Sequence, residues 1–326
     1  FFGGARGVRF VSDPASAAAQ AAREGRRLMV WAGAAPDAPA PGATAVRVED
    51  GFLRSRGLGA ELVPPLSLVL DDLGIYYDPR RESRLERLIA TSGALRPGQR
   101  DRAEALIRFL VARGLTKYNL PGALPELPAG RRILVPGQVE DDASIRLGGG
   151  EVRTNLALLE HARAANPEAR ILYKPHPDVE AGLRPGAVPE AAARALADVI
   201  LPHSDAAALL GAVDEVWTMT SLLGFEALLR GGPVTTLGSP FYAGWGLTHD
   251  LGRVSARRGA RIPLAGLVHA ALIAYPRYLD PVTGRPCPAE VAAARLAQGA
   301  GAPRGAGNRA LAKLQGLLAG HAALWR

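Results

Sequence analysis

The stretch that most constrains the fold of this chain runs from Asp214 to Gly238, DEVWTMTSLLGFEALLRGGPVTTLG. Val216–Met219 is a short apolar run rich in β-forming residues, and a helical pattern follows from Leu222 to Arg230. After a Gly-Gly stop, Pro233–Leu237 has the composition of a second strand. This order predicts a strand–helix–strand unit, the building block of a parallel sheet.

The turn of this unit contains Thr220 and Ser221, which place two hydroxyls at a helix N-terminus. Free backbone N–H groups at such a terminus suit a phosphate. Glu226 lies one turn into the helix and could reach a ribose attached to that phosphate. The alternative is that Ser221 only caps the helix. A second anion-type motif upstream, described below, favours the phosphate.

The composition is that of a globular α/β enzyme of two domains, with 326 residues of which 48% are hydrophobic. We find no apolar run of about 18 residues and therefore expect no membrane span. The single Cys287 excludes an internal disulfide and a cysteine zinc cluster, so we expect a cytoplasmic protein. Because the chain starts at Phe1 without a signal-peptide pattern, we expect it to be a piece of a longer protein.

The net charge of +8 favours anionic partners such as nucleotide sugars or phospholipid head groups. Scattered arginines on solvated helices would explain the charge equally well. The basic residues are not interleaved with aromatic ones as in single-strand binders, so we expect no nucleic-acid partner.

Helix and strand patterns alternate along the chain, which predicts an α/β fold. The proline-rich LPELPAG at 124–130 reads as a linker between two Rossmann-like domains, at 1–125 and 131–270, with parallel sheets facing across a cleft. Residues 271–326 are expected to form a helical C-terminal segment that packs back on the body, ending in a helix over Arg309–Trp325. Further strands are expected at Arg27–Trp31, Val46–Val48, Leu66–Leu70, Arg132–Pro136, Arg170–Lys174 and Val199–Leu201, and helices at 14–25, Ser83–Thr91, Arg100–Arg113, Thr154–Asn166, Ala191–Ala197 and Ser204–Gly211, the last capped by Ser204.

Polar clusters follow several predicted strands, where ligands of such sheets bind. The clusters are Glu49-Asp50-Gly51, Glu140-Asp141-Asp142, His176-Pro177 and Thr220-Ser221. The chain has no G-x-G-x-x-G after a strand and no Walker A lysine motif, which disfavours a dinucleotide oxidoreductase and a P-loop NTPase.

His176 is held between two prolines and could donate to a phosphate or to a departing phosphoryl oxygen. The alternative is a histidine satisfied within a turn. Lys174 adds a positive charge that could face the same anion.

The three carboxylates Glu140–Asp142 could simply form a solvated turn, or they could form a metal site. No D-x-D motif is present as such. In retaining sugar chemistry one carboxylate acts as nucleophile and a second group as acid/base. Glu49 and Asp50 offer that second group from the other domain. Tyr242 and Trp245, in PFYAGWGLTHD, could stack on a sugar, although core packing is the commoner role of such residues. No cluster has convincing metal spacing.

Six blocks together resemble one known family: VEDGFLRSRGLG, LVPPLSLVLDDLGIYYD, LVPGQVEDDASI, YKPHPDVEAG, WTMTSLLGFEALLRG and PVTTLGSPFYAGWGLTHD. They are similar to the capsule polysaccharide β-Kdo transferases of the KpsC type, and the similarity extends from about Val46 to about Cys287. The segment YPRYLDPVTGRPC resembles the end of the N-terminal module of those two-module proteins.

The resemblance implies a GT-B glycosyltransferase that takes Kdo from CMP-β-Kdo with retention of configuration. Its acceptor would be a Kdo-terminated linker on lyso-phosphatidylglycerol, extended for capsule export, with a β-2,4 linkage favoured over β-2,7. The enzyme would use no cofactor or metal and would be cytoplasmic, peripheral to the inner membrane, with possible contacts to capsule assembly proteins. The alternatives are an inverting, sialyltransferase-like enzyme for CMP-nonulosonates and a noncatalytic scaffold module.

The resemblance also implies residue roles, since bacterial sialyltransferases share its motifs. Asp142 is favoured as the nucleophile that forms a covalent Kdo adduct, with Asp141 beside it, and Glu49 is preferred to Asp50 as the acid/base. The donor-binding set is Gln138, Lys174, His176, Pro177, Thr220, Ser221, Glu226 and Arg54, in which Lys174 and Arg54 would neutralise the Kdo carboxylate.

Overall fold

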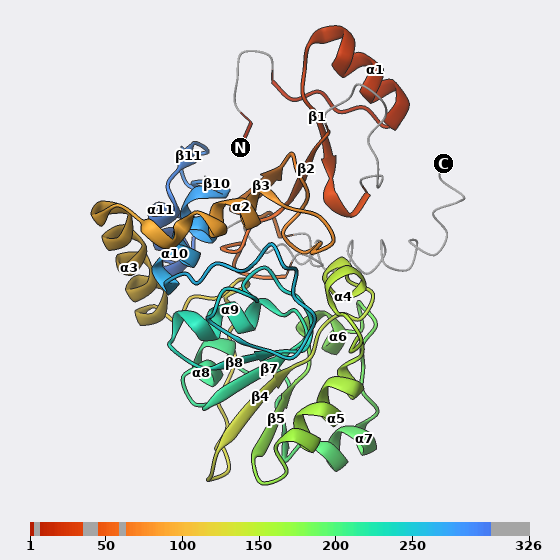
Figure 1. The fold of residues 1–326 in the computed structure, drawn as a ribbon, viewed down its shortest axis with the longest axis vertical. Helices are drawn as coiled ribbons and strands as arrows, with labels where there is room; N and C mark the ends of the chain where they lie inside the picture. Colours follow the sequence, from red (N-terminus) through yellow and green to blue (C-terminus); the bar gives the residue numbers. More distant parts are fainter. Residues whose placement is uncertain (3–6, 35–44, 59–62, 301–326) are drawn as a thin grey trace.

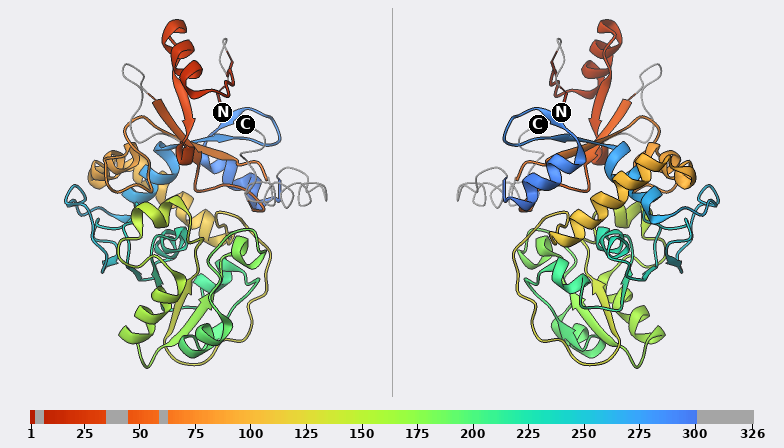
Figure 2. Two further views of the ribbon diagram at one scale, coloured as in Figure 1. Left: turned by 90° about the vertical axis from the view of Figure 1, so that its right-hand side faces the viewer. Right: turned by 90° about the vertical axis from the view of Figure 1, so that its left-hand side faces the viewer.

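The computed structural model describes residues 1–2, 7–34, 45–58 and 63–300. Two lobes are stacked along the long axis of the molecule (Figures 1 and 2). The predicted helix at Arg309–Trp325 lies outside the described residues. No helix among those ranges is long and apolar enough to cross a membrane.

The second lobe is built on a six-stranded sheet in which every pairing is parallel, as predicted. The spatial order is β6-β5-β4-β7-β8-β9, so in chain order the strands read 3-2-1-4-5-6, the doubly wound arrangement. The strands are β4 (Arg132–Pro136), β5 (Arg170–Lys174), β6 (Val199–Ile200), β7 (Glu215–Thr218), β8 (Val234–Thr236) and β9 (His249–Asp250). The strand order reverses between β4 and β7, where Ile133 pairs with Glu215, and a ligand crevice is expected at their carboxyl ends.

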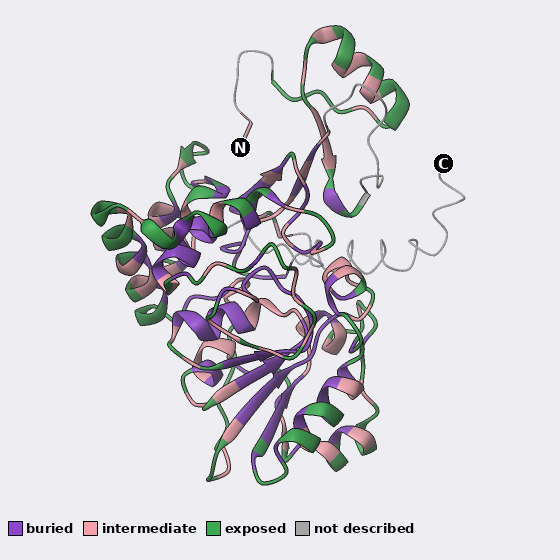
Figure 3. Ribbon diagram, viewed as in Figure 1, coloured by how far each residue is buried: buried purple, intermediate pink, exposed green. Residues whose placement is uncertain are grey.

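Both faces of this sheet are buried, which explains its continuous apolar strands. On β4, Ile133 and Val135 point into one hydrophobic cluster and Leu134 into the other, because alternate strand residues face opposite sides. Figure 3 shows these strands as the buried centre of the lobe. Helices α5 (Asn155–Ala165) and α7 (Glu190–Leu196) cover the first face, and α8 (Ala206–Leu210) and α9 (Leu222–Leu229) cover the second.

The first lobe departs from the prediction, because its five-stranded sheet is mixed. The order is β1-β2-β3-β10-β11, formed by β1 (Leu28–Trp31), β2 (Ala45–Asp50), β3 (Ser67–Asp71), β10 (Pro276–Leu279) and β11 (Pro286–Cys287). Only β1 and β2 are parallel. The expectation of two parallel sheets is therefore wrong for this lobe. The chain reverses its direction in the loop between β2 and β3, so β3 pairs antiparallel with β2.

The segment from residue 271 is also not wholly helical. It contributes β10 and β11 to the first sheet before α11 (Ala289–Ala297). The Tyr275 hydroxyl donates to Asp71 at the end of β3, at 2.9 Å, which fixes the point where the chain enters the sheet. The segment therefore packs back on the body, as expected, but by strand pairing.

Helices line the outer side of the first lobe. They are α1 (Pro14–Glu24), α2 (Arg84–Ala90), α3 (Pro97–Ala112), α10 (Leu264–Val268) and a π-helical turn at His269–Ala274, with short 3₁₀ turns at Ala32–Ala34 and Ser92–Ala94. One predicted cap is wrong: Asp205, not Ser204, accepts the first N–H groups of α8, while the Ser204 hydroxyl donates to the Leu201 carbonyl.

One hydrophobic cluster runs through both lobes and joins them. Phe52 of the first lobe stacks on Phe241 of the second with ring centroids 4.6 Å apart, and Phe225 of α9 lies 5.3 Å from Phe241. A buried ion pair adds a polar link, because Arg258 donates to Glu86 of α2 at 3.0 Å. The lobes are thus packed directly on each other beside the pocket described next.

Candidate active site

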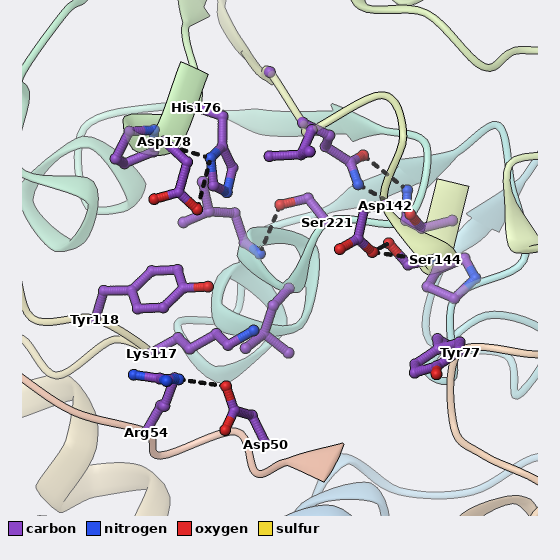
Figure 4. Close-up of a pocket in the computed structure, with 18 of the residues that line it drawn as sticks. Asp50, Arg54, Tyr77, Lys117, Tyr118, Asp142, Ser144, His176, Asp178 and Ser221 are labelled. Atoms are coloured by element: carbon purple, nitrogen blue, oxygen red, sulfur yellow. Dashed lines mark hydrogen bonds and ion pairs between the residues drawn. The ribbon is translucent and has the colours of Figure 1, made fainter. Parts of the chain in front are cut away.

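A cavity of about 660 Å³ opens between the lobes at the carboxyl ends of β2, β4, β5 and β7. The residues predicted as site residues all line it: Glu49, Asp50, Arg54, Gln138, Asp141, Asp142, Lys174, His176, Pro177, Thr220, Ser221 and Glu226. Figure 4 shows part of this lining, with side chains from both lobes pointing into one space. Residues that lie up to 177 positions apart in the sequence therefore meet in one pocket.

Gln138 fixes the crevice where the strand order reverses. Its side-chain oxygen accepts from the Thr218 hydroxyl at 3.1 Å and from the Thr220 N–H at 3.0 Å, and its nitrogen donates to the Thr220 hydroxyl at 2.9 Å. These bonds tie the turn after β4 to the turn after β7. Gln138 therefore fixes the position of Thr220 at the crevice.

Asp142 caps α4 (Ala143–Gly148), a short helix that the sequence analysis did not predict. Its Oδ1 accepts from the Ser144 N–H at 2.8 Å and from the Ser144 hydroxyl at 2.7 Å. Both hydrogen bonds fall on one oxygen, which leaves Oδ2 available to the pocket (Figure 4). The carboxylate is thus held in one orientation, with one oxygen left for the pocket.

The neighbouring carboxylates have different partners. Asp141 lies at the rim, about half exposed, and pairs with Arg184 at 2.6 Å. Glu140 accepts from the Asn155 N–H at 2.7 Å at the start of α5. Among the residues that the structure describes, no three acidic, histidine or cysteine side chains gather as a metal site requires.

Glu49 and Asp50 approach from the end of β2 in the first lobe. The pKa of Glu49 is raised to about 7, chiefly by burial, which outweighs the lowering effect of the hydrogen bond from the Asp50 N–H. The charges of Asp50 and Asp142 contribute to the rise, and the charge of Lys117 opposes it. Such a carboxyl can take or give a proton near neutral pH. Its Oε1 accepts from the Asp50 N–H at 2.9 Å, which orients the group.

Asp50 is held by Arg54, which was expected to face a ligand carboxylate. The buried Arg54 guanidinium donates to Asp50 Oδ2 at 2.5 Å and also to the Ser55 hydroxyl and the Val63 carbonyl. The second oxygen of Asp50 is buried without a hydrogen-bond partner. The structure thus gives Arg54 protein partners and makes it a support for Asp50.

His176 caps the short helix α6 (Pro177–Glu180), with Pro177 in the first helical position that suits proline. Its Nδ1 accepts from the Asp178 N–H at 3.1 Å. The pKa of His176 is lowered to about 4, chiefly by burial and also by nearby cations, of which Lys117 has the largest effect. The ring is therefore neutral at physiological pH, with its proton on Nε2 as a donor.

Thr220 and Ser221 also keep donors for a ligand. The Thr220 hydroxyl accepts from Gln138, and the Ser221 hydroxyl accepts from the Leu223 N–H at the start of α9. Among the described residues neither hydroxyl donates a hydrogen bond, so the hydrogen of each could be donated to an anion. Lys174, at the end of β5, is 5% exposed, and burial lowers its pKa.

Glu226 and the predicted stacking aromatics have structural contacts. The buried Glu226 accepts from the Lys117 N–H at 2.7 Å, although it also lines the pocket, and burial raises its pKa to about 7. Tyr242 and Trp245 are fully buried. The Tyr242 hydroxyl donates to the Ser221 carbonyl at 2.5 Å and its ring packs where Gly224 has no side chain, so Tyr242 supports the turn.

The lining residues that were not predicted as site residues include Trp31, Tyr77 and Lys117. Trp31 ends β1 with 48% of its surface exposed. Lys117 lies in the loop after α3, which carries no motif. Trp31 could have been recognised from its place at the end of a predicted strand, next to the strand that ends in Glu49.

Comparison with known proteins identifies the family. A family described as "Capsule polysaccharide biosynthesis protein" matches residues 34–127 and 123–278. The chain belongs to this family. The capsule polysaccharide modification proteins LipA of Neisseria meningitidis serogroup B and serogroup A are each 48% identical to it over 251 residues, or 76% of the chain.

A third relative is the lipopolysaccharide-processing protein LpsZ of Rhizobium meliloti, 46% identical over 237 residues, or 71% of the chain. The chain spans 35% of the length of LipA and 54% of the length of LpsZ. It therefore corresponds to a part of these curated relatives.

Two solved structures from Thermosulfurimonas dismutans KpsC share the fold. The β-Kdo 2,7 transferase is 35% identical with a TM-score of 0.75, covering 88% of this chain and 90% of its own. The β-Kdo 2,4 transferase is 37% identical with a TM-score of 0.71, covering 78% and 80%. The resemblance predicted from the motifs is thus confirmed at the level of family and fold.

Proposed function

We propose that this chain is a retaining β-Kdo transferase that moves Kdo from CMP-β-Kdo to a Kdo-terminated glycolipid linker in capsule assembly. The observation that carries the proposal is one pocket in which Asp142 and Glu49 meet from opposite lobes beside a set of anion donors. The similarity to two Kdo transferases supports the sugar.

The donor phosphate fits between His176, Thr220 and Ser221. The Nε2–H of His176 and the two free hydroxyl hydrogens would donate to its oxygens, and Lys174 would neutralise charge on the same side. These hydrogen bonds would stabilise the departing CMP more than the intact CMP-Kdo, because negative charge grows on the phosphate as the bond breaks. The cytidine ribose would lie near Glu226.

In the first step Asp142 Oδ2 attacks the anomeric carbon of Kdo, and the bond from that carbon to the phosphate oxygen breaks. CMP leaves with the bonding electron pair, and the product is a Kdo ester of Asp142. The fixed Ser144 hydrogen bonds hold the attacking carboxylate in place. Such positioning is a large part of what a protein contributes to a displacement.

In the second step a hydroxyl of the acceptor attacks the same carbon from the opposite side. Glu49 takes the hydroxyl proton and the Asp142 carboxylate leaves, so two inversions give net retention. Because its pKa is about 7, Glu49 is ionised in a substantial fraction of molecules at neutral pH and can act as the base.

The acceptor would enter from the first lobe. Trp31 lines the pocket with about half of its surface exposed, on the strand beside β2. A sugar ring stacks well on an exposed indole, unlike on the buried Trp245. We assign the terminal sugar of the acceptor to Trp31.

The linkage is proposed to be β-2,4, and the two solved relatives, which make different linkages, are similar to this chain to nearly the same degree. We further propose that transfer needs no metal and takes place at the cytoplasmic face of the inner membrane, in peripheral contact with it and with capsule assembly proteins.

Incubation with CMP-Kdo and a synthetic Kdo-terminated acceptor tests the function. Transfer should persist in EDTA, and NMR of the product should show a β-2,4 bond. Transfer that survives Asp142→Asn would instead indicate an inverting, sialyltransferase-like reaction. Donor binding without transfer to any Kdo acceptor would indicate a noncatalytic module.

A further inference from the structure

Lys117 has a rigid backbone position between the two lobes. Its N–H donates to Glu226 of the second lobe at 2.7 Å, and its carbonyl accepts from the Ser55 N–H of the first lobe at 3.2 Å. The turn around it is closed by Asn119, whose side chain accepts from the Thr116 N–H and donates to the Ser55 carbonyl. These hydrogen bonds fix the Cα position of Lys117 between the lobes.

The Lys117 side chain enters the pocket between Asp50 and Asp142 (Figure 4). Its ammonium lies over the Tyr118 ring, 5.1 Å from the centroid. Among the residues that the structure describes, no carboxylate lies within 4.0 Å of this ammonium. Burial lowers the pKa of Lys117, but the neighbouring Tyr118 side chain and the charges of Asp50 and Asp142 outweigh that effect, so the pKa is raised and the cation persists.

Three other cations of the pocket have different partners or positions. Arg54 is bonded to Asp50, and Arg184 is paired with Asp141 at the rim. Lys174 lies at the end of β5, the strand that leads into the His176 turn. Lys117 is therefore a cation beside Asp50 and Asp142 that forms no ion pair among the described residues, and its charge also reaches His176.

We propose that Lys117 binds the carboxylate of the donor sugar, an inference that rests on the proposed function. In a 2-keto sugar acid this carboxylate is attached to the very carbon that Asp142 attacks and from which the phosphate leaves. It must lie to the side of the line joining nucleophile and leaving group. A positive charge there lets two carboxylates, that of Asp142 and that of the sugar, come together without repulsion.

The same contact would select the donor. A CMP-linked neutral sugar would leave the Lys117 ammonium without an anion in a half-enclosed pocket. The enzyme would then reject a neutral sugar because a polar group is left unpaired, and not because of shape alone. Rejection by an unpaired polar group is the more selective of the two. The class of donor that fits is a CMP-activated keto-acid sugar.

The test compares two ligands that differ only in the sugar acid. Titration calorimetry on the full chain measures the affinity for CMP and for CMP-Kdo, in an Asp142→Asn background that stops adduct formation. Lys117→Met should weaken CMP-Kdo binding roughly 10- to 100-fold, the worth of a charged hydrogen bond, and change CMP binding less than about twofold. Lys117→Arg should restore most of the loss.

Lys174→Met is the matched control, because it removes an ammonium from the phosphate side. It should weaken CMP and CMP-Kdo by similar factors. Equal weakening of both ligands by Lys117→Met would make Lys117 a phosphate ligand and overturn the inference, as would no effect on either. Retained CMP binding shows that the variant is folded.

The proposed function fails in a different way. A wild-type chain that forms neither adduct nor transfer product refutes the transferase, whatever the ratio of the two affinities. A wild-type chain that binds CMP-Kdo no more tightly than CMP refutes the carboxylate site, whether or not transfer occurs.

Discussion

Replacement of Glu49 by Gln should separate the two halves of the reaction. Gln keeps the size of the side chain and an oxygen that can accept from the Asp50 N–H, so the local structure is retained. The first step needs no base, and the Kdo adduct should still form on Asp142. The second step loses its base, and transfer to the acceptor should fall by about 10²- to 10⁴-fold.

The wild-type pH profile follows from the same group. With a pKa of about 7, the reactive carboxylate form of Glu49 becomes scarce as the pH falls. Its ionised fraction decreases from about 0.8 near pH 7.5 to about 0.1 near pH 6, so the transfer step should slow about eightfold. His176 stays neutral throughout, because its pKa is about 4. The profile should be flat in Glu49→Gln.

The assay isolates the second step: the adduct is formed first, acceptor is then added, and loss of the adduct is followed by intact mass. Glu226 provides the control, because its pKa is also about 7 and it lines the same pocket. Glu226→Gln should retain the pH dependence. Loss of adduct formation in Glu49→Gln, or loss of the pH dependence in Glu226→Gln, would refute the role given to Glu49.

Two further substitutions test other parts of the structure. Trp31→Ala should raise the KM for the acceptor by roughly tenfold with little change in the rate of adduct formation, because stacking contributes about 1 kcal/mol or more; an unchanged acceptor KM would remove Trp31 from the site. Glu86→Ala should lower the free energy of unfolding by about 3–5 kcal/mol in urea denaturation, because it leaves Arg258 buried without its partner. Glu82→Ala, which breaks an exposed pair with Arg87, should cost less than about 1 kcal/mol, and equal costs would contradict the reasoning.

The second lobe was predictable from sequence because its signals are local. β4 and β5 have the predicted bounds, and each polar cluster falls at a strand end as expected. Ser221 is both the predicted cap of α9 and a pocket residue, so the two interpretations of the turn are compatible. Caps and strand ends are determined by residues a few positions apart, which is the range a sequence pattern covers.

The first lobe was harder, because strand direction depends on distant parts of the chain. β10 enters the sheet more than 200 residues after β3 and is fixed by the Tyr275–Asp71 hydrogen bond. No local pattern distinguishes a strand of this kind from the helical surroundings in which it was placed. Pairing with β3, rather than propensity, decides its conformation.

The site shows the same division. The motifs predicted residues that line one pocket, but they did not predict the contacts among those residues and their neighbours. Arg54 forms a hydrogen bond with Asp50, and Glu226 accepts one from the backbone of Lys117. Lys117 itself was missed, because it lies in a loop without a motif and only the packing of the lobes brings it near Asp142.

The covalent intermediate is tested most directly by intact-mass spectrometry after incubation with CMP-Kdo generated in situ, without acceptor. The wild type should gain the mass of one Kdo residue, and Asp142→Asn should not, although Asn still accepts at the α4 cap and should preserve the fold. Transfer to a Kdo-terminated acceptor with no adduct, undiminished in Asp142→Asn, would contradict the double displacement and favour direct attack assisted by Glu49 or Asp50.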